Sequence, residues 1–132
     1  HIVLDGMACA PLAARPEMFE GRDPRRQSVG ALSVAVPANL LAWEEALRRF
    51  GRFTLADVAE PAIRLASRGF EVSRYLHECV SEAAADLALD RHIATLFLPG
   101  GGPVAAGARL LQPALGETLR HVAREGAAAL HH

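Results

Sequence analysis

The chain has 132 residues, about half of them apolar, and a formal net charge of −1. This length suits one domain, and its dominant residues, alanine and leucine, favour helices. A nearly neutral chain has no field of one sign that would attract nucleic acid or an anionic membrane, and no apolar run here is long enough to span a bilayer.

The start of the chain is predicted to hold two short strands. Residues 1–4 (HIVL) form the first, which Asp5 and Gly6 interrupt. Residues 20–30 (EGRDPRRQSVG) have the composition of a solvated loop, and the β-branched residues of 31–36 (ALSVAV) predict the second strand. Two isolated strands do not make a stable sheet, so we expect a sheet completed by other sequence. The apolar start likewise leads us to expect sequence upstream.

Residues 37–51 predict an amphipathic helix with marked ends. Pro37 suits a first helical turn, and Asn39 is an alternative N-cap. Gly51 can take the left-handed conformation that commonly ends a helix. The segment is therefore expected to be a packing unit that follows directly on the second strand.

The two faces of this helix are predicted to differ. Glu44 and Glu45 precede Arg48 and Arg49 by four residues, an order that contributes only tenths of a kcal/mol on an exposed face. The opposite face carries an apolar stripe that we expect to pack on neighbouring helices: Leu40, Trp43, Leu47 and Phe50.

The next predicted helix begins at Thr54, which with Asp57 resembles a capping box. Pro61 removes a backbone hydrogen bond and is expected to kink or break the helix, which Gly69 closes. Ser73 is a good N-cap for the helix after that.

Two further helices are predicted in the last third of the chain. A short one ends at the run PGGGP, which we interpret as a solvated turn within residues 99–108. The last opens at Gln112-Pro113 and stops at Gly126. Its inward residues are expected to be Leu115, Leu119 and Val122.

No arrangement of residues indicates a catalytic or metal site, so we predict no catalytic residue, metal ligand or cofactor within this chain. The two cysteines, Cys9 and Cys79, are too few for a disulfide framework, and Cys79 lies on a helical stripe where we expect burial. A thiol–imidazole pair between Cys9 and a histidine is an open alternative. The histidines lack metal-binding spacing, and those in helices are interpreted as surface positions: His77, His92, His121, with no metal role for the terminal His131 and His132.

Three stretches resemble the gamma-glutamyltransferase (gamma-glutamyltranspeptidase) family. They are LDGMACAP, SVAVPANLLAWEEALRRFGRFTLADVAEPAIRLASRGFEVS and LLQPALGETLRHVAREGAAAL. The family shows L-D-x-x-x-x-A-P, then V-P-G and a helix, then E-P-A-I-x-L-A-x-x-G-F-x-V-S and Q-P-x-L-A-x-T-L-x-x-I-A-x-x-G. The resemblance runs from Leu4 to about Leu130, nearly the whole chain.

The resemblance implies a four-layer αββα fold of the N-terminal nucleophile hydrolase type, of which this chain would be a mostly α part with two short strands. Residues 1–36 would be a strand and loop segment, and residues 37–132 the helical segment of the large subunit. In the family a precursor cleaves itself, and the new N-terminal threonine of the small subunit attacks a gamma-glutamyl amide such as that of glutathione.

That implication makes the whole protein an enzyme and this chain, by itself, inactive. The partners would be the small subunit from the same precursor and a small-molecule amide substrate, with no nucleic acid and no membrane. The nucleophilic threonine and the oxyanion donors would lie outside the chain. No targeting segment indicates a compartment, whether periplasmic, extracellular or cytoplasmic.

One departure from the family bears on the substrate. Typical members follow L-D with an aromatic residue, an arginine that binds the substrate's α-carboxylate, and a glutamate, where this chain has Gly6, Met7 and Ala8. The resemblance thus makes Asp5, Gly6 and Met7 the substrate-binding segment, but methionine cannot make a bidentate carboxylate contact. Either the protein takes other acyl groups, as an acylase does, or another arginine binds the carboxylate.

A second departure lies at the start of the helical segment, where V-P-G becomes Val36-Pro37-Ala38. A glycine needed for positive φ would leave alanine strained there, and we expect Ala38 in ordinary helical geometry instead. Three hypotheses remain open for the chain: part of a gamma-glutamyltransferase, part of an acylase-like amide hydrolase, and a non-catalytic helical interaction domain.

Overall fold

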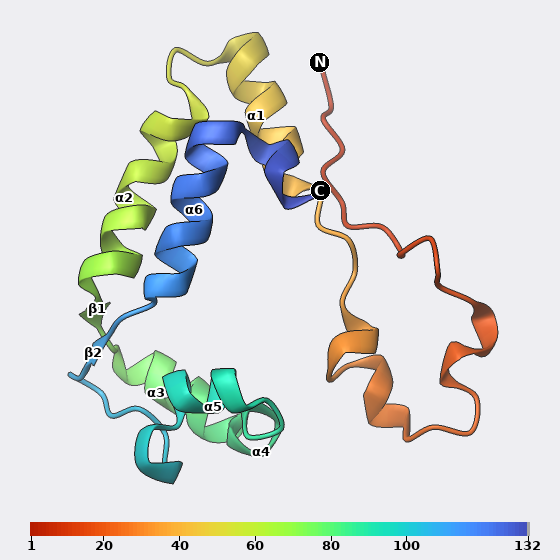
Figure 1. Cartoon of the computed structure of the whole chain (residues 1–132), viewed down its shortest axis with the longest axis vertical. Helices are drawn as coiled ribbons and strands as arrows, with labels where there is room; N and C mark the ends of the chain where they lie inside the picture. The colour runs from red at the N-terminus through yellow and green to blue at the C-terminus, as the bar shows by residue number, and fades with distance from the viewer. Residues whose placement is uncertain (132) are drawn as a thin grey trace.

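The computed structural model describes residues 1–131, so the prediction made for His132 lies outside the described residues. Residues 1–38 form an N-terminal arm that runs as a long loop beside the helices (Figure 1). Short 3-10 helices interrupt the arm at Pro16–Phe19, Pro24–Gln27 and Ala31–Ser33. In the described part of the chain, no residue before Ile63 is buried.

Neither predicted strand of the arm forms. Residues 1–4 are irregular, and residues 31–33 make a 3-10 turn. What remains is an isolated antiparallel bridge in which the backbones of Cys9 and Val36 exchange hydrogen bonds of 3.1 and 2.9 Å. The β-branched residues favour a strand only when a neighbouring strand is there to pair with them, and these residues have a single bridge.

Helix α1 (Asn39–Phe50) begins and ends differently from the prediction. Ala38 is its N-cap, with φ −125° and ψ −4°, so it is neither helical nor strained by a positive φ. Asn39 lies inside the helix. Gly51 is extended, with φ −84°, rather than left-handed. Glycine suits this position because an added Cβ would lie only 2.7 Å from the Leu47 carbonyl oxygen.

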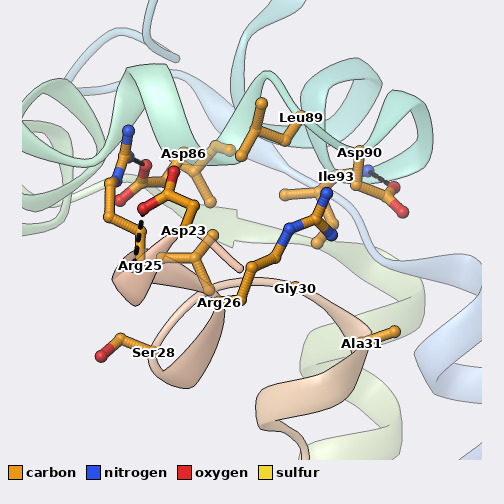
Figure 2. A pocket seen from close by; sticks show the side chains of 12 residues that line it. Asp23, Arg25, Arg26, Ser28, Gly30, Ala31, Asp86, Leu89, Asp90 and Ile93 are labelled. Atoms are coloured by element: carbon orange, nitrogen blue, oxygen red, sulfur yellow. Dashed lines mark hydrogen bonds and ion pairs between the residues drawn. The ribbon is translucent and has the colours of Figure 1, made fainter. Parts of the chain in front are cut away.

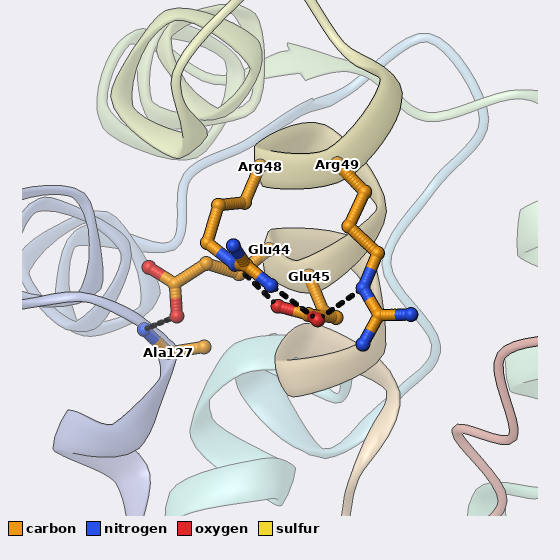
Figure 3. A network of polar contacts seen from close by, with 5 residues as sticks. All are labelled: Glu44, Glu45, Arg48, Arg49 and Ala127. Atoms are coloured by element: carbon orange, nitrogen blue, oxygen red, sulfur yellow. Dashed lines mark hydrogen bonds and ion pairs between the residues drawn. The ribbon is translucent and has the colours of Figure 1, made fainter.

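One hydrogen bond ties α1 to the end of the chain (Figure 3). The Glu44 carboxylate accepts a hydrogen bond of 3.2 Å from the Ala127 backbone N–H, at a 3-10 helix spanning Ala127–Leu130. Glu45 instead takes both arginines, accepting two bonds of 2.7 Å from Arg48 and another from Arg49. The predicted pairing of Glu44 with Arg48 is therefore wrong, because Glu44 is bound to the backbone of another segment.

The apolar stripe of α1 is only partly buried, although it was predicted to pack on neighbouring helices. Trp43 is 56% exposed and Phe50 is 61% exposed, while Leu40 and Leu47 are half-buried. The expected packing on neighbouring helices is thus wrong for the two aromatic residues in this chain.

Helix α2 (Leu55–Arg68) has the predicted start and end. The Thr54 hydroxyl accepts from the Asp57 N–H at 3.2 Å, and the Asp57 carboxylate accepts from the Thr54 N–H at 2.8 Å, which confirms the capping box. Gly69 ends the helix at φ 77°. Pro61 was predicted to kink or break the helix; it lies inside one continuous helix, so the break does not occur.

Helix α6 (Pro113–Glu125) runs beside α2, and the two form the longest helix pair of the molecule (Figure 1). Gly116 allows the close approach, because an added Cβ would lie 2.7 Å from the Ser67 hydroxyl and 3.7 Å from the Ala66 Cβ. Arg120 donates to the Ser67 hydroxyl at 2.5 Å. Val122 is buried as predicted, whereas Leu115 is 43% exposed.

The two strands that do form lie between these long helices. β1 (Phe70–Glu71) pairs antiparallel with β2 (Arg109–Leu110), with Phe70 opposite Leu110. The Arg109 side chain donates to the Arg68 carbonyl at 2.7 Å and so satisfies one free carbonyl at the end of α2. The two strands thus continue directly from α2 and lead directly into α6.

Residues between β1 and β2 make a small helical unit at one end of the molecule (Figure 1). It contains α3 (Arg74–Glu82), α4 (Ala84–Leu87) and α5 (Arg91–Phe97), and Ser73 caps α3 as predicted with a 3.1 Å bond to the Leu76 N–H. This unit and β2 together form a buried apolar cluster: Val72, Val80, Leu98, Val104 and Leu110. The chain is therefore mostly helical with two short strands, as predicted, although the strands lie at other positions.

Candidate functional site

The segment that the sequence marks for substrate binding is a short turn at Asp5, Gly6 and Met7. The Asp5 carboxylate accepts a hydrogen bond of 2.9 Å from the Met7 backbone N–H. This bond folds the segment and directs the chain toward Cys9. Met7 is 79% exposed, so its thioether is open to solvent in this chain.

Two contacts hold this turn against the start of α1. Gly6 faces the first turns of the helix so closely that an added Cβ would lie 2.7 Å from the Ala42 Cβ and 3.3 Å from the Asn39 Cα. Three residues after Gly6, the bridge between Cys9 and Val36 ties the arm to the segment that leads into α1. The turn is therefore fixed at both sides of Met7.

The sequence did not reveal the partner of Gly6. Ala42 lies 36 positions further along the chain, on a helix face that the apolar stripe does not include. A small residue on a helix is too common to indicate a contact by itself. The glycine in place of an aromatic residue was the available signal, since glycine often marks a close backbone approach.

The histidine and cysteine candidates do not form a reactive group. His77 is half-buried, and its Nδ1 lies 2.9 Å from the Val104 carbonyl oxygen, so it fastens the glycine-rich segment to α3 rather than standing on the surface as predicted. Cys9 and Cys79 are both free thiols, the first exposed and the second only partly buried. A hydrogen bond with the Cys79 thiol raises the pKa of Tyr75.

The described residues offer no donor set for a metal. Within residues 1–131, no group of three or more histidine, cysteine, aspartate or glutamate side chains could hold an ion. No helix within the same residues is both long enough and apolar enough to cross a membrane.

A cavity of about 730 Å³ lies where the arm meets α4 and α5 (Figure 2). The Arg25 guanidinium pairs with Asp86 across it. Asp90 caps α5 through bonds of 2.8 and 2.9 Å from the N–H groups of His92 and Ile93, and these bonds lower the pKa of Asp90. The carboxylates of Asp86 and Asp90 at this cavity therefore already have partners within the chain. The cavity lies at the contact between the arm and the helices α4 and α5.

Comparison with known proteins places these features in a family. A sequence profile of the gamma-glutamyltranspeptidase family matches residues 1–132. The chain belongs to this family. The resemblance of its motifs is thereby confirmed.

The curated relatives of the chain include an acylase and a glutathione hydrolase. The acylase ACY 1 proenzyme of Pseudomonas sp. (strain SE83) is 46% identical over 99% of this chain and 25% of its own length. Glutathione hydrolase 2 of Arabidopsis thaliana is 31% identical over 99% of this chain and 22% of its own length. The chain thus spans about a quarter of the length of these relatives.

A solved structure shows the same arrangement of elements. The gamma-glutamyltranspeptidase of Helicobacter pylori superposes with a TM-score of 0.89 at 27% identity, over 96% of this chain and 38% of that one. The helical segment with its two short strands is therefore a recurring part of the family's architecture.

Proposed function

We propose that this chain is part of the large subunit of an acylase-like amide hydrolase of the gamma-glutamyltranspeptidase family. The observation that carries the proposal is Met7, an exposed residue whose backbone N–H is held by Asp5, at the position where the family's motif has the carboxylate-binding arginine. A thioether offers no charge to a carboxylate. The enzyme would accordingly favour acyl groups that are not held through the α-carboxylate of an amino acid.

The identity values give independent support. The acylase proenzyme of strain SE83 is 46% identical to the chain, against 31% for the Arabidopsis thaliana glutathione hydrolase over the same share of the chain. The long motif of residues 60–73 lies in α2, in β1 and at the N-cap of α3, so it does not include the turn at Met7. In this proposal the motif carries the family resemblance, and the turn carries the preference for the acyl group.

In this proposal the reaction is divided between two polypeptides. The small subunit supplies an N-terminal threonine, whose hydroxyl attacks the amide carbonyl and expels the amine, leaving an acyl ester on the threonine. Water then attacks that ester, releases the carboxylic acid and returns the proton to the threonine oxygen. The present residues orient the acyl group through the turn at Asp5, Gly6 and Met7.

A pair of substrates and a pair of variants test the proposal in the full-length, processed protein. Butanoyl anilide is gamma-glutamyl anilide without its amino and α-carboxylate groups, and wild type is expected to hydrolyse it with the higher kcat/KM. Met7→Arg is expected to raise kcat/KM for gamma-glutamyl anilide by roughly 10- to 100-fold, since a hydrogen bond to a charged group contributes about 1.5–3 kcal/mol. Met7→Leu, the uncharged control, should leave the preference unchanged.

The second candidate is a gamma-glutamyl hydrolase or transferase that uses another arginine. The description of the matching family, gamma-glutamyltranspeptidase, favours it. Wild-type preference for gamma-glutamyl anilide, with no gain from Met7→Arg, would select this candidate over the acylase.

A further inference from the structure

We propose that Gly6 and Ala42 form a positioning pair that sets where Met7 meets the acyl group. The inference rests on the proposed function, because it assigns the device that holds the same substrate-binding turn. It gives Gly6 a specific part within that turn, and it adds Ala42, for which neither the motif comparison nor the search for reactive side chains gave a role.

The contact leaves no room for a side chain at position 6. An ideal Cβ on Gly6 would lie 2.7 Å from the Ala42 Cβ, closer than such atoms approach in proteins, and 3.3 Å from the Asn39 Cα. The Asn39 atom belongs to the backbone of the first turn of α1. Any larger residue must therefore push the turn away from the helix, since helix backbone does not yield easily.

Met7 would follow any such displacement. It is the next residue along the chain, and its own N–H is tied to Asp5 at 2.9 Å. The bridge at Cys9 and Val36 fixes the other end of the segment, so the segment would bend between two anchored points. A displacement of about 1 Å at a substrate-orienting residue can cost on the order of 100-fold in rate.

The geometry also names the compensating change. Ala42 contributes the nearer of the two atoms, and its Cβ is removed by Ala42→Gly. The added Cβ in Gly6→Ala can then occupy the space that Ala42 has left. The double variant should therefore keep the turn in its wild-type position, whereas Gly6→Ala alone should displace it.

The test is a double-mutant cycle in the full-length, processed protein with the anilide that wild type hydrolyses best. Gly6→Ala should lower kcat/KM by about tenfold or more, chiefly through KM, because the acyl group binds in the wrong place. Adding Ala42→Gly should recover most of the loss. Gly102→Ala is the matched control, since Gly102 has an ordinary φ of −120° and open space around its Cβ position.

Thermal unfolding of the wild type, the two single variants Gly6→Ala and Ala42→Gly, and the double variant tests the contact independently of catalysis. Tm should fall in Gly6→Ala and rise again, relative to the sum of the single changes, in the double variant. If Gly6→Ala does not fold or process, recovery of folded protein by Ala42→Gly is the readout. If the effects of the two substitutions on Tm, or on the recovery of folded protein, are independent of each other, the proposed contact is overturned.

The failures of the two proposals are distinguishable. A wild-type protein that prefers gamma-glutamyl anilide contradicts the acylase proposal, while the cycle still tests the positioning pair on that substrate. An active wild type with unchanged KM in Gly6→Ala overturns the positioning pair alone. A wild type that hydrolyses neither anilide removes the substrate role of the turn, and with it the role of the pair.

Discussion

Glu45 shows how a single residue of this chain differs from its sequence pattern. Spacing predicts two separate pairs, yet Glu45 takes both arginines while Glu44 binds the backbone N–H of Ala127 (Figure 3). Hydrogen bonds from Arg48 and then Arg49 lower the pKa of Glu45 from 4.5 to about 2. The lowered pKa means that the folded state holds this carboxylate in its charged form more strongly than the unfolded chain does.

The pH dependence of stability follows from the direction of that shift. A depressed pKa contributes stability that is present above about pH 4.5 and is lost as the pH falls toward about 2. Glu45→Gln should therefore lower Tm at pH 7, and the difference from wild type should vanish near pH 2. Glu60→Gln is the control, because its pair with Arg64 is 3.8 Å long. A difference in Tm that stayed constant across this range would contradict the assignment.

At the scale of elements, the α2–α6 pair depends on a glycine inside a helix. Gly116 normally would be a weak point, since glycine costs about 1 kcal/mol relative to alanine in a helix interior. Here the space above it is filled by the Ser67 hydroxyl, which also accepts from Arg120 at 2.5 Å. The close approach of the two helices thus outweighs the helix propensity of the residue.

Gly116→Ala is accordingly expected to destabilise the protein by about 1 kcal/mol net, because overpacking costs about 1–3 kcal/mol and the propensity gain offsets part of it. In a Ser67→Ala background the same change should be neutral or stabilising, since the obstructing oxygen is gone. Urea unfolding of the two single variants and the double variant measures both effects. A stabilising Gly116→Ala in the wild-type background would show that the Ser67 hydroxyl can move aside without cost.

Elements with their own local signals could be predicted from the sequence. The capping box at Thr54 and Asp57, the stop at Gly69 and the N-cap at Ser73 all depend on residues close in sequence, and the structure confirms them. The strand predicted at residues 31–36 failed because strand formation needs a partner that this chain does not supply beyond one bridge. The family motif and the turn proposed to bind substrate were visible in the sequence, but the contact of Gly6 with Ala42 is long-range and carries no local signal.

The whole molecule presents apolar surface that its own residues do not cover. Trp43, Phe50 and Phe53 are each more than half exposed along and just after α1. The chain spans about a quarter of the length of its relatives, so most of the polypeptide in those proteins lies outside this segment. We expect the exposed aromatic residues to pack against that remaining polypeptide, since aromatic side chains lose much of their hydrophobic contribution when exposed.

This expectation gives a measurable result for Trp43. In the full-length protein Trp43→Ala should lower the free energy of unfolding by roughly 3–5 kcal/mol, the cost of removing a buried tryptophan. Trp43→Phe, which keeps an aromatic ring, should cost less. Equilibrium unfolding of both variants decides the matter, and a loss below about 1 kcal/mol for alanine would show that the ring stays in water.

The pairing of β1 with β2 has a consequence for how this family can change. Phe70 lies opposite Leu110, so the chain leaves and re-enters the α2–α6 pair at neighbouring points. The helices between β1 and β2, which have their own apolar cluster, are connected to the long helices through this pair of two-residue strands. Insertions or deletions between β1 and β2 change the entropic cost of closing this loop only slightly, and they leave the two long helices in place. We therefore expect homologues to vary in length within this segment.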